Sequence, residues 1–133
     1  MVYEVGIVAQ FEAAHRLSGD FGAASHLHGH TYRVDVSVRG ESLGTDGTLC
    51  DIGSLRSQVG AIIERLDYQN LDEVADLAGQ NTTAEVVARL IHDWIAPNLP
   101  SGVIDTLAVR VWESPSVWAG YEARIAEATP RAR

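Results

Sequence analysis

The chain has 133 residues, a length that favours a single domain over residues 1–133. Apolar residues make up 46% and charged residues 21% of it, proportions typical of a globular domain with one hydrophobic core. The net charge of −8 disfavours nucleic-acid binding. No segment approaches the ~20 apolar residues of a membrane span.

Cysteine usage and the N-terminal residues indicate the cellular compartment in which the protein is expected. Cys50 is the only cysteine, so no intrachain disulfide can form, as is usual in reducing compartments. The N-terminal segment carries Glu4 and Glu12 and lacks the basic leader of a signal peptide. We therefore expect a cytoplasmic protein.

The first two segments show the two-residue periodicity of β-strands. Residues 3–11 alternate between apolar and mixed positions, which predicts a strand. Residues 32–39 alternate more regularly, which predicts a half-buried antiparallel strand. Asp46-Gly47 is a favoured turn pair, so residues 48–50 are expected to return as a strand that includes Cys50.

Two amphipathic helices are predicted next. Apolar residues recur at helical spacing from Ser54, a candidate N-cap, to about Asp67. The segment 82–85 has capping-box form, and a second apolar stripe follows it until Pro97. His92 lies in this second helix, where we expect it on the surface.

The last elements complete the layering. Residues 103–113 and 117–121 are predicted as strands, and a tail from about residue 125 is expected to be disordered. This order predicts an α+β fold with two helices on one face of an antiparallel four-stranded sheet. A small open sheet leaves unpaired edges, so we expect a homo-oligomer.

Three histidines carry the strongest chemical signal. His28 and His30 are two residues apart, so they point the same way in an extended backbone. Both are in phase with the apolar face of the following strand, and His15 is in phase with the apolar face of the first strand. Three converging imidazoles with an open fourth position are typical of a catalytic zinc site. Structural zinc motifs with paired cysteines are excluded.

Glu113 is a second candidate, because it is in phase with the apolar residues of the strand 103–113. A carboxylate on a buried face needs a partner, and it could bind a ligand with a guanidine-like edge. The alternative is that the strand has already left the core and that Glu113 is solvated.

Six segments, taken together, resemble the 6-pyruvoyl-tetrahydropterin synthase family, which includes 6-carboxytetrahydropterin synthase. They are FEAAH at 11–15, LHGHTY at 27–32, CDIGSLR at 50–56, LDYQNLD at 66–72, NTTAEVVA at 81–88 and VRVWES at 109–114. The resemblance implies the tunnelling fold, an oligomeric barrel of trimers stacked into hexamers, and sites at subunit interfaces. It also implies that His15, His28 and His30 bind zinc and that Glu113 binds a pterin ring.

Two positions depart from the family pattern. The family places a catalytic cysteine four residues before the first histidine of HGH, and this position is Ala24 here. The family's Asp-His pair after the first helix reads Asp67-Tyr68. Candidate replacements for proton transfer are Ser25 and His26, which follow the vacant position, and Tyr68 with Asp67. Cys50 is expected to be a core residue.

Three functions are compatible with these residues. The favoured one is a zinc-dependent lyase or cyclase, resembling a carbon–oxygen lyase, that acts on a pterin-like or related polyhydroxylated small molecule with altered proton-transfer residues. The second is the ordinary 6-pyruvoyl- or 6-carboxytetrahydropterin synthase reaction on dihydroneopterin triphosphate. The third is a non-catalytic pterin- or purine-binding protein.

Overall fold

A computed structural model describes residues 1–125, which form one mixed sheet and two helices. The sheet has five strands in the order β3-β1-β2-β4-β5. Neighbouring strands are antiparallel except β3, which pairs with β1 in parallel. The strands are β1 (Tyr3–His15), β2 (His28–Gly40), β3 (Gln69–Asn70), β4 (Thr106–Ser114) and β5 (Val117–Arg124). The α+β fold class is confirmed, but the sheet has five strands instead of four, since the two-residue β3 is too short to show a periodicity.

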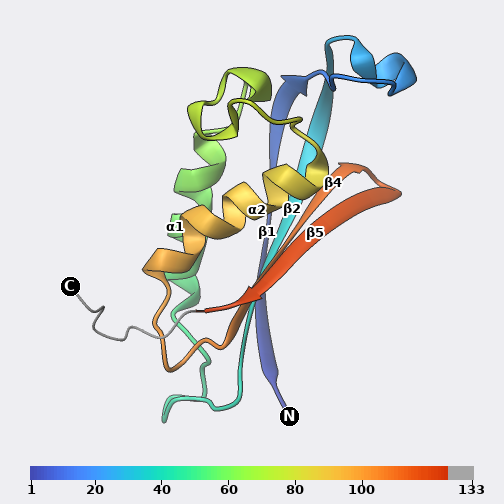
Figure 1. Ribbon diagram of the computed structural model, residues 1–133. Helices are drawn as coiled ribbons and strands as arrows, with labels where there is room; N and C mark the ends of the chain where they lie inside the picture. The colour runs from blue at the N-terminus through green and yellow to red at the C-terminus, as the bar shows by residue number, and fades with distance from the viewer. Residues whose placement is uncertain (126–133) are drawn as a thin grey trace, which may run out of the picture.

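Both α-helices pack on one face of the sheet, as Figure 1 shows. They are α1 (Ile52–Glu64) and α2 (Ala84–Ile95). Short 3-10 turns complete the chain at Gly22–Ser25 (η1), Leu71–Glu73 (η2), Ala75–Leu77 (η3) and Ala96–Asn98 (η4). The alternating apolar residues of β1, β2 and β4 face the helices, so the core lies between the sheet and the helix layer.

The pairing of β1 with β2 positions the site. The two strands pair over their whole length, from Tyr3 opposite Gly40 to His15 opposite His28. Phe11 and Tyr32 are directly opposite in this ladder, and their rings stack at 4.8 Å in the core. The end of β1 and the start of β2 are therefore fixed against each other by continuous backbone pairing.

The expected strand at residues 48–50 is wrong. Leu49 and Cys50 form a bend that leads into α1, so Cys50 is not in a strand. Helix α1 also begins earlier than expected, because the N-cap is Asp51 and not Ser54. The Asp51 carboxylate accepts a hydrogen bond from the Ser54 backbone N–H at 3.1 Å. The helix ends at Glu64, before Asp67.

Two expectations for the second helix also need correction. Its N-cap is Thr83, whose hydroxyl accepts from the Val86 N–H, so Thr82 is free for another role. His92 is only 5% exposed and packs edge-on against the Tyr121 ring at 4.8 Å, so it is a core residue and not a surface one. His92 lies beside the apolar stripe of α2, on the face of the helix that packs against β5.

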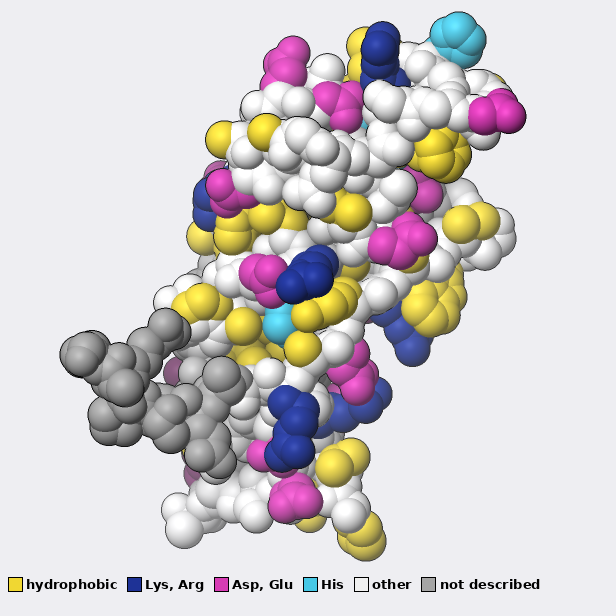
Figure 2. Space-filling view, in the orientation of Figure 1, with side chains coloured by type: hydrophobic (Ala, Val, Ile, Leu, Met, Phe, Trp, Pro, Cys, Tyr) yellow, Lys and Arg dark blue, Asp and Glu magenta, His cyan; other side chains and the backbone are white. Residues whose placement is uncertain are grey.

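Long stretches of both sheet edges are unpaired within residues 1–125. β1 pairs with β3 only at Ala13 and Ala14, and β5 pairs with β4 alone. No helix in this part of the chain is both long and apolar enough to cross a membrane. On the face in Figure 2, acidic and basic side chains are interspersed among apolar ones, without an extended basic area. The expected disordered tail falls mainly on residues 126–133, outside the described residues.

Candidate metal and substrate site

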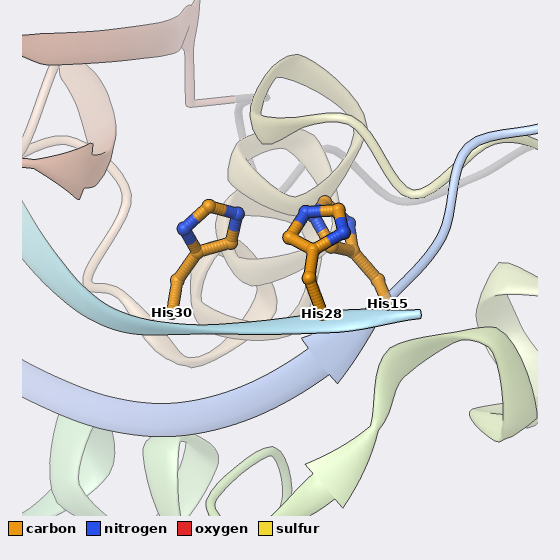
Figure 3. Close-up of side chains that lie close together, drawn as sticks. All are labelled: His15, His28 and His30. Carbon is orange, nitrogen blue, oxygen red and sulfur yellow. The ribbon is translucent and has the colours of Figure 1, made fainter. Parts of the chain in front are cut away.

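The structure brings the three histidines predicted from the sequence together. His15 ends β1, and His28 and His30 begin β2, so all three side chains stand on the same side of the paired strands (Figure 3). Their ring centroids are 4.6 to 5.2 Å apart. One nitrogen from each ring lies within 4.8 Å of the other two. This spacing suits a single metal ion at the centre of the cluster.

Hydrogen bonds fix the tautomers of two of these rings. Nδ1 of His15 lies 2.8 Å from the backbone oxygen of Thr82, and Nδ1 of His28 lies 2.7 Å from that of His26. A carbonyl oxygen only accepts, so each Nδ1 carries a proton, and in the neutral form of each ring Nε2 then holds the free lone pair. Metal-binding histidines commonly donate their second ring N–H in this way.

Buried nitrogen atoms support a metal in this position. His15 is 1% exposed, and Nε2 of His15 and Nε2 of His30 are buried without a hydrogen-bond partner among the described residues. Burial lowers the pKa of His30, although the Glu113 carboxylate opposes this shift. The lowered pKa favours the neutral imidazole that metals bind. A set of three imidazole nitrogen donors matches zinc.

Glu113 lies against the histidine cluster. It is placed at an irregularity in the β4–β5 pairing, between Trp112 and Ser114. Its Oε2 is 3.3 Å from Nε2 of His30 and 3.7 Å from Nε2 of His15. Bulges of this kind often redirect a side chain near a functional site. The carboxylate is thus turned toward the cluster and not toward open solvent, with 28% of its side chain exposed.

Tyr32, the first residue of the predicted strand 32–39, was not predicted to belong to the site. It is fully buried, its ring lies 5.2 Å from that of His30, and its hydroxyl has no partner within residues 1–125. Burial raises the pKa of Tyr32, and Glu113 and Asp72 add to this effect. Its in-phase position two residues after His30 is the signal that could have identified it.

The loop residues at the vacant family position do not contact the cluster with their side chains. Ala24 and Ser25 lie in η1, where the Ser25 hydroxyl donates to the Gly19 carbonyl at 3.0 Å. The His26 side chain is exposed, and only its backbone oxygen reaches a cluster residue, His28. None of the three is therefore positioned as a base within its own chain.

Asp67 and Tyr68 lie beside β1, at the backbone of Glu12. Asp67 accepts from the Glu12 N–H at 2.8 Å, and the Tyr68 N–H donates to the Glu12 oxygen at 2.6 Å. Tyr68 is 82% exposed and has a φ of 57°. It borders a hollow of about 490 Å³ that Glu12 and Thr31 also line. Ala13 and His30 also line this hollow, while the side chains of Glu12 and Thr31 alternate with theirs and so face away from the cluster.

Cys50 is far from the cluster. It lines a separate hollow of about 850 Å³ near the end of β2 that contains Gly40. At about 3.3 Å per residue, the length of β2 separates that end from His28 by roughly 40 Å. Burial, and then the charge of Asp51, raises the pKa of the Cys50 thiol. This thiol does not occupy the place of the missing family cysteine.

Comparisons with known proteins agree with the fold. The sequence model of the family described as 6-pyruvoyl tetrahydropterin synthase matches residues 4–124. The chain is 33% identical over 105 residues to a dihydroneopterin monophosphate aldolase of Pyrococcus furiosus, covering 79% of this chain and 84% of the relative. It is 34% identical over 118 residues to human 6-pyruvoyl tetrahydrobiopterin synthase, covering 78% and 80%. The structure of Caenorhabditis elegans 6-pyruvoyl tetrahydropterin synthase matches with a TM-score of 0.80 and 25% identity, covering 92% of this chain and 96% of that one.

Proposed function

Because the chain belongs to the 6-pyruvoyl tetrahydropterin synthase family, we propose that it is a zinc-dependent lyase acting on a pterin-like, polyhydroxylated small molecule. The observation that carries this proposal is the convergence of three imidazoles, two of whose buried Nε2 atoms have no hydrogen-bond partner within residues 1–125. His15, His28 and His30 would hold the ion. We further propose that the proton-transfer residues differ from the family's cysteine and histidine, since Ala24 and Tyr68 stand at those positions.

The bound metal, Glu113 and Tyr32 would each have a different role in the reaction. A bound zinc ion would act as a Lewis acid toward a hydroxyl or carbonyl oxygen of the substrate side chain. Glu113, turned toward the cluster, would orient the ring by accepting hydrogen bonds from its N–H and amino groups. The buried Tyr32 packs beside His30, and its ring would exclude water from that side of the site.

Proton transfer is the part of the reaction for which one chain is insufficient. Asp67 is engaged by the Glu12 backbone N–H, and the side chains of Tyr68 and His26 are exposed, without a hydrogen bond to the cluster within residues 1–125. We propose that these groups, with Ser25, act at a site shared between neighbouring subunits of a homohexamer in the cytoplasm. The unpaired edges of β1 and β5 support such an assembly, because edge strands favour pairing with another chain.

A second candidate reaction is aldol cleavage of a carbon–carbon bond in the substrate side chain, in place of carbon–oxygen elimination. The Pyrococcus furiosus relative named dihydroneopterin monophosphate aldolase favours it. Both reactions need an oxygen polarised by the metal and a base for one proton, so the same cluster could serve either.

Metal analysis and product analysis test the proposal together. The purified protein should contain about one zinc ion per chain. His28→Ala and His30→Ala should lose most of it, because two imidazoles cannot complete the site. His26→Ala is the matched control, since its side chain lies outside the cluster, and it should keep the zinc.

Incubation with dihydroneopterin triphosphate or monophosphate, followed by mass spectrometry, distinguishes the reactions. Elimination keeps all carbon atoms in the pterin product, whereas aldol cleavage releases a short aldehyde fragment. Pterin binding without any product would instead identify a binding protein. Near-unit zinc content in both histidine variants would overturn the metal assignment.

A further inference from the structure

The zinc-site residue His15 is held by a threonine from the segment before α2. Thr82 is fully buried. Two of its oxygen atoms face Nδ1 of His15, the backbone oxygen at 2.8 Å and the hydroxyl oxygen at 3.2 Å. Because the carbonyl can only accept, the hydroxyl oxygen is a second acceptor for the same N–H. Thr82 therefore sets both the orientation and the tautomer of the ring.

The direction of the Thr82 hydroxyl is set in turn by Asp72. The hydroxyl donates to Oδ1 of Asp72 at 2.8 Å. Its only proton is thus directed at the carboxylate, and a lone pair is left for His15. A hydroxyl free to rotate could instead donate to Nδ1, which would favour the tautomer whose Nε2 cannot bind a metal.

Asp72 also holds the backbone that follows His15. Its Oδ2 accepts from the Arg16 N–H at 2.9 Å, and its own N–H donates to the Asn70 side chain at 2.9 Å. One carboxylate, in the short turn η2, therefore fixes the last peptide of β1 and, through Thr82, the imidazole of His15.

We infer that Asp72 is a positioning residue of the metal centre, acting on His15 through the Thr82 hydroxyl. This inference rests on the proposed zinc site. A carboxylate linked to a histidine ligand orients the ring and raises its basicity, and loss of such a partner typically weakens metal affinity about 10- to 100-fold. Asp72 thus extends the site from three histidines to a chain of hydrogen bonds that reaches the surface.

Zinc affinity, measured by competition with a chromophoric chelator, is the direct test. Asp72→Asn keeps the size of the side chain but cannot accept both hydrogen bonds through two oxygen atoms, so the zinc dissociation constant should rise about 10- to 100-fold. Glu73→Gln removes a neighbouring charge in the same turn, where the Glu73 side chain has no hydrogen bond within residues 1–125, and should leave the constant unchanged.

Two substitutions of Thr82 separate positioning from folding. Thr82→Val removes the hydroxyl but keeps the backbone oxygen, and should weaken zinc binding by several-fold or more. Thr82→Ser restores the hydroxyl and should restore affinity. The visible absorption of cobalt-substituted protein should shift in Asp72→Asn and Thr82→Val and remain like wild type in Thr82→Ser, while the melting temperatures of the metal-free proteins show whether each variant folds.

The outcomes distinguish the role of Asp72 from the proposed zinc site on which it rests. A wild-type protein that does not bind zinc would overturn the proposed function. A wild-type protein that binds zinc, with equal affinity and an unchanged cobalt spectrum in Asp72→Asn and Thr82→Val, would overturn the role of Asp72 alone. If Asp72→Asn does not fold, the Thr82 pair decides the question.

Discussion

Glu113 provides a test of how the site divides metal binding from substrate binding. Its Oε2 lies 3.3 Å from Nε2 of His30, close enough for two roles to compete. It could bind the ring of a pterin, as we propose, or it could serve as a fourth ligand to the metal. Glu113→Gln separates these roles, because glutamine has the same shape but carries no charge and only one acceptor oxygen.

The size of the effect follows from the hydrogen bonds at stake. A hydrogen bond to a charged group contributes about 1.5–3 kcal/mol. The Glu113 side chain is only 28% exposed, so solvent weakens this contribution but does not remove it. Loss of one such bond corresponds to about 10- to 150-fold weaker binding of a pterin, at 1.4 kcal/mol per tenfold.

Titration of the zinc-loaded protein with neopterin, followed by calorimetry, measures the change in affinity, and metal analysis of the same sample gives its zinc content. We expect zinc near one per chain and weakened neopterin binding. Glu64→Gln, an exposed change at the end of α1, is the control and should alter neither. If Glu113→Gln loses zinc, and neopterin affinity falls only in proportion to the lost zinc, this division of roles would be refuted.

Three further predictions concern the thiol, the assembly and the vacant positions. Cys50→Ala should leave zinc content and turnover unchanged, and loss of turnover would show that Cys50 takes part in the reaction. Burial raises the pKa of the Cys50 thiol, so the thiol should react slowly with iodoacetamide at pH 8. Light scattering should give a hexamer, and a monomer of 14.4 kDa at micromolar concentration would contradict the proposed shared site. Ala24→Cys combined with Tyr68→His should restore a thiol and an imidazole beside Asp67, and so raise the family reaction on dihydroneopterin triphosphate by ~10²–10⁴-fold over the wild type. Either single change alone should give little, and robust wild-type turnover would argue against altered proton transfer.

The strands were predictable where periodicity was long and regular. The alternation in β1 and β2 placed His15, His28 and His30 on one face, and the continuous pairing of the two strands keeps that parity up to their ends. The short β3 was not predictable, because Gln69 and Asn70 pair with β1 only through tertiary packing.

Local signals failed where tertiary contacts competed with them. Thr82 and Thr83 both suit an N-cap, and the structure uses Thr83 because the Thr82 hydroxyl is bonded to Asp72. The turn pair before Cys50 indicated a hairpin, but Asp51 caps α1 instead, so the chain leaves the sheet there. The role of Asp72 could not be read from the sequence, since it depends on contacts across η2, β1 and the segment before α2.

The arrangement would also allow the proposed reaction to diverge while the proposed metal centre stays intact. The three histidines lie on strands whose every residue is paired, so a one-residue shift in register would place His15 on the face opposite His28 and His30. Ala24 and Tyr68 lie instead in η1 and in the turn after α1, where a substitution changes no backbone pairing of the long strands. Tyr68 is an example of a position that can be substituted, because its side chain is exposed. Its backbone φ is 57°, a conformation that histidine also tolerates better than most residues. A fold of this kind could therefore exchange the proposed proton-transfer groups without loss of the proposed metal site, and differences in reaction between relatives should be sought in these two loops before the sheet.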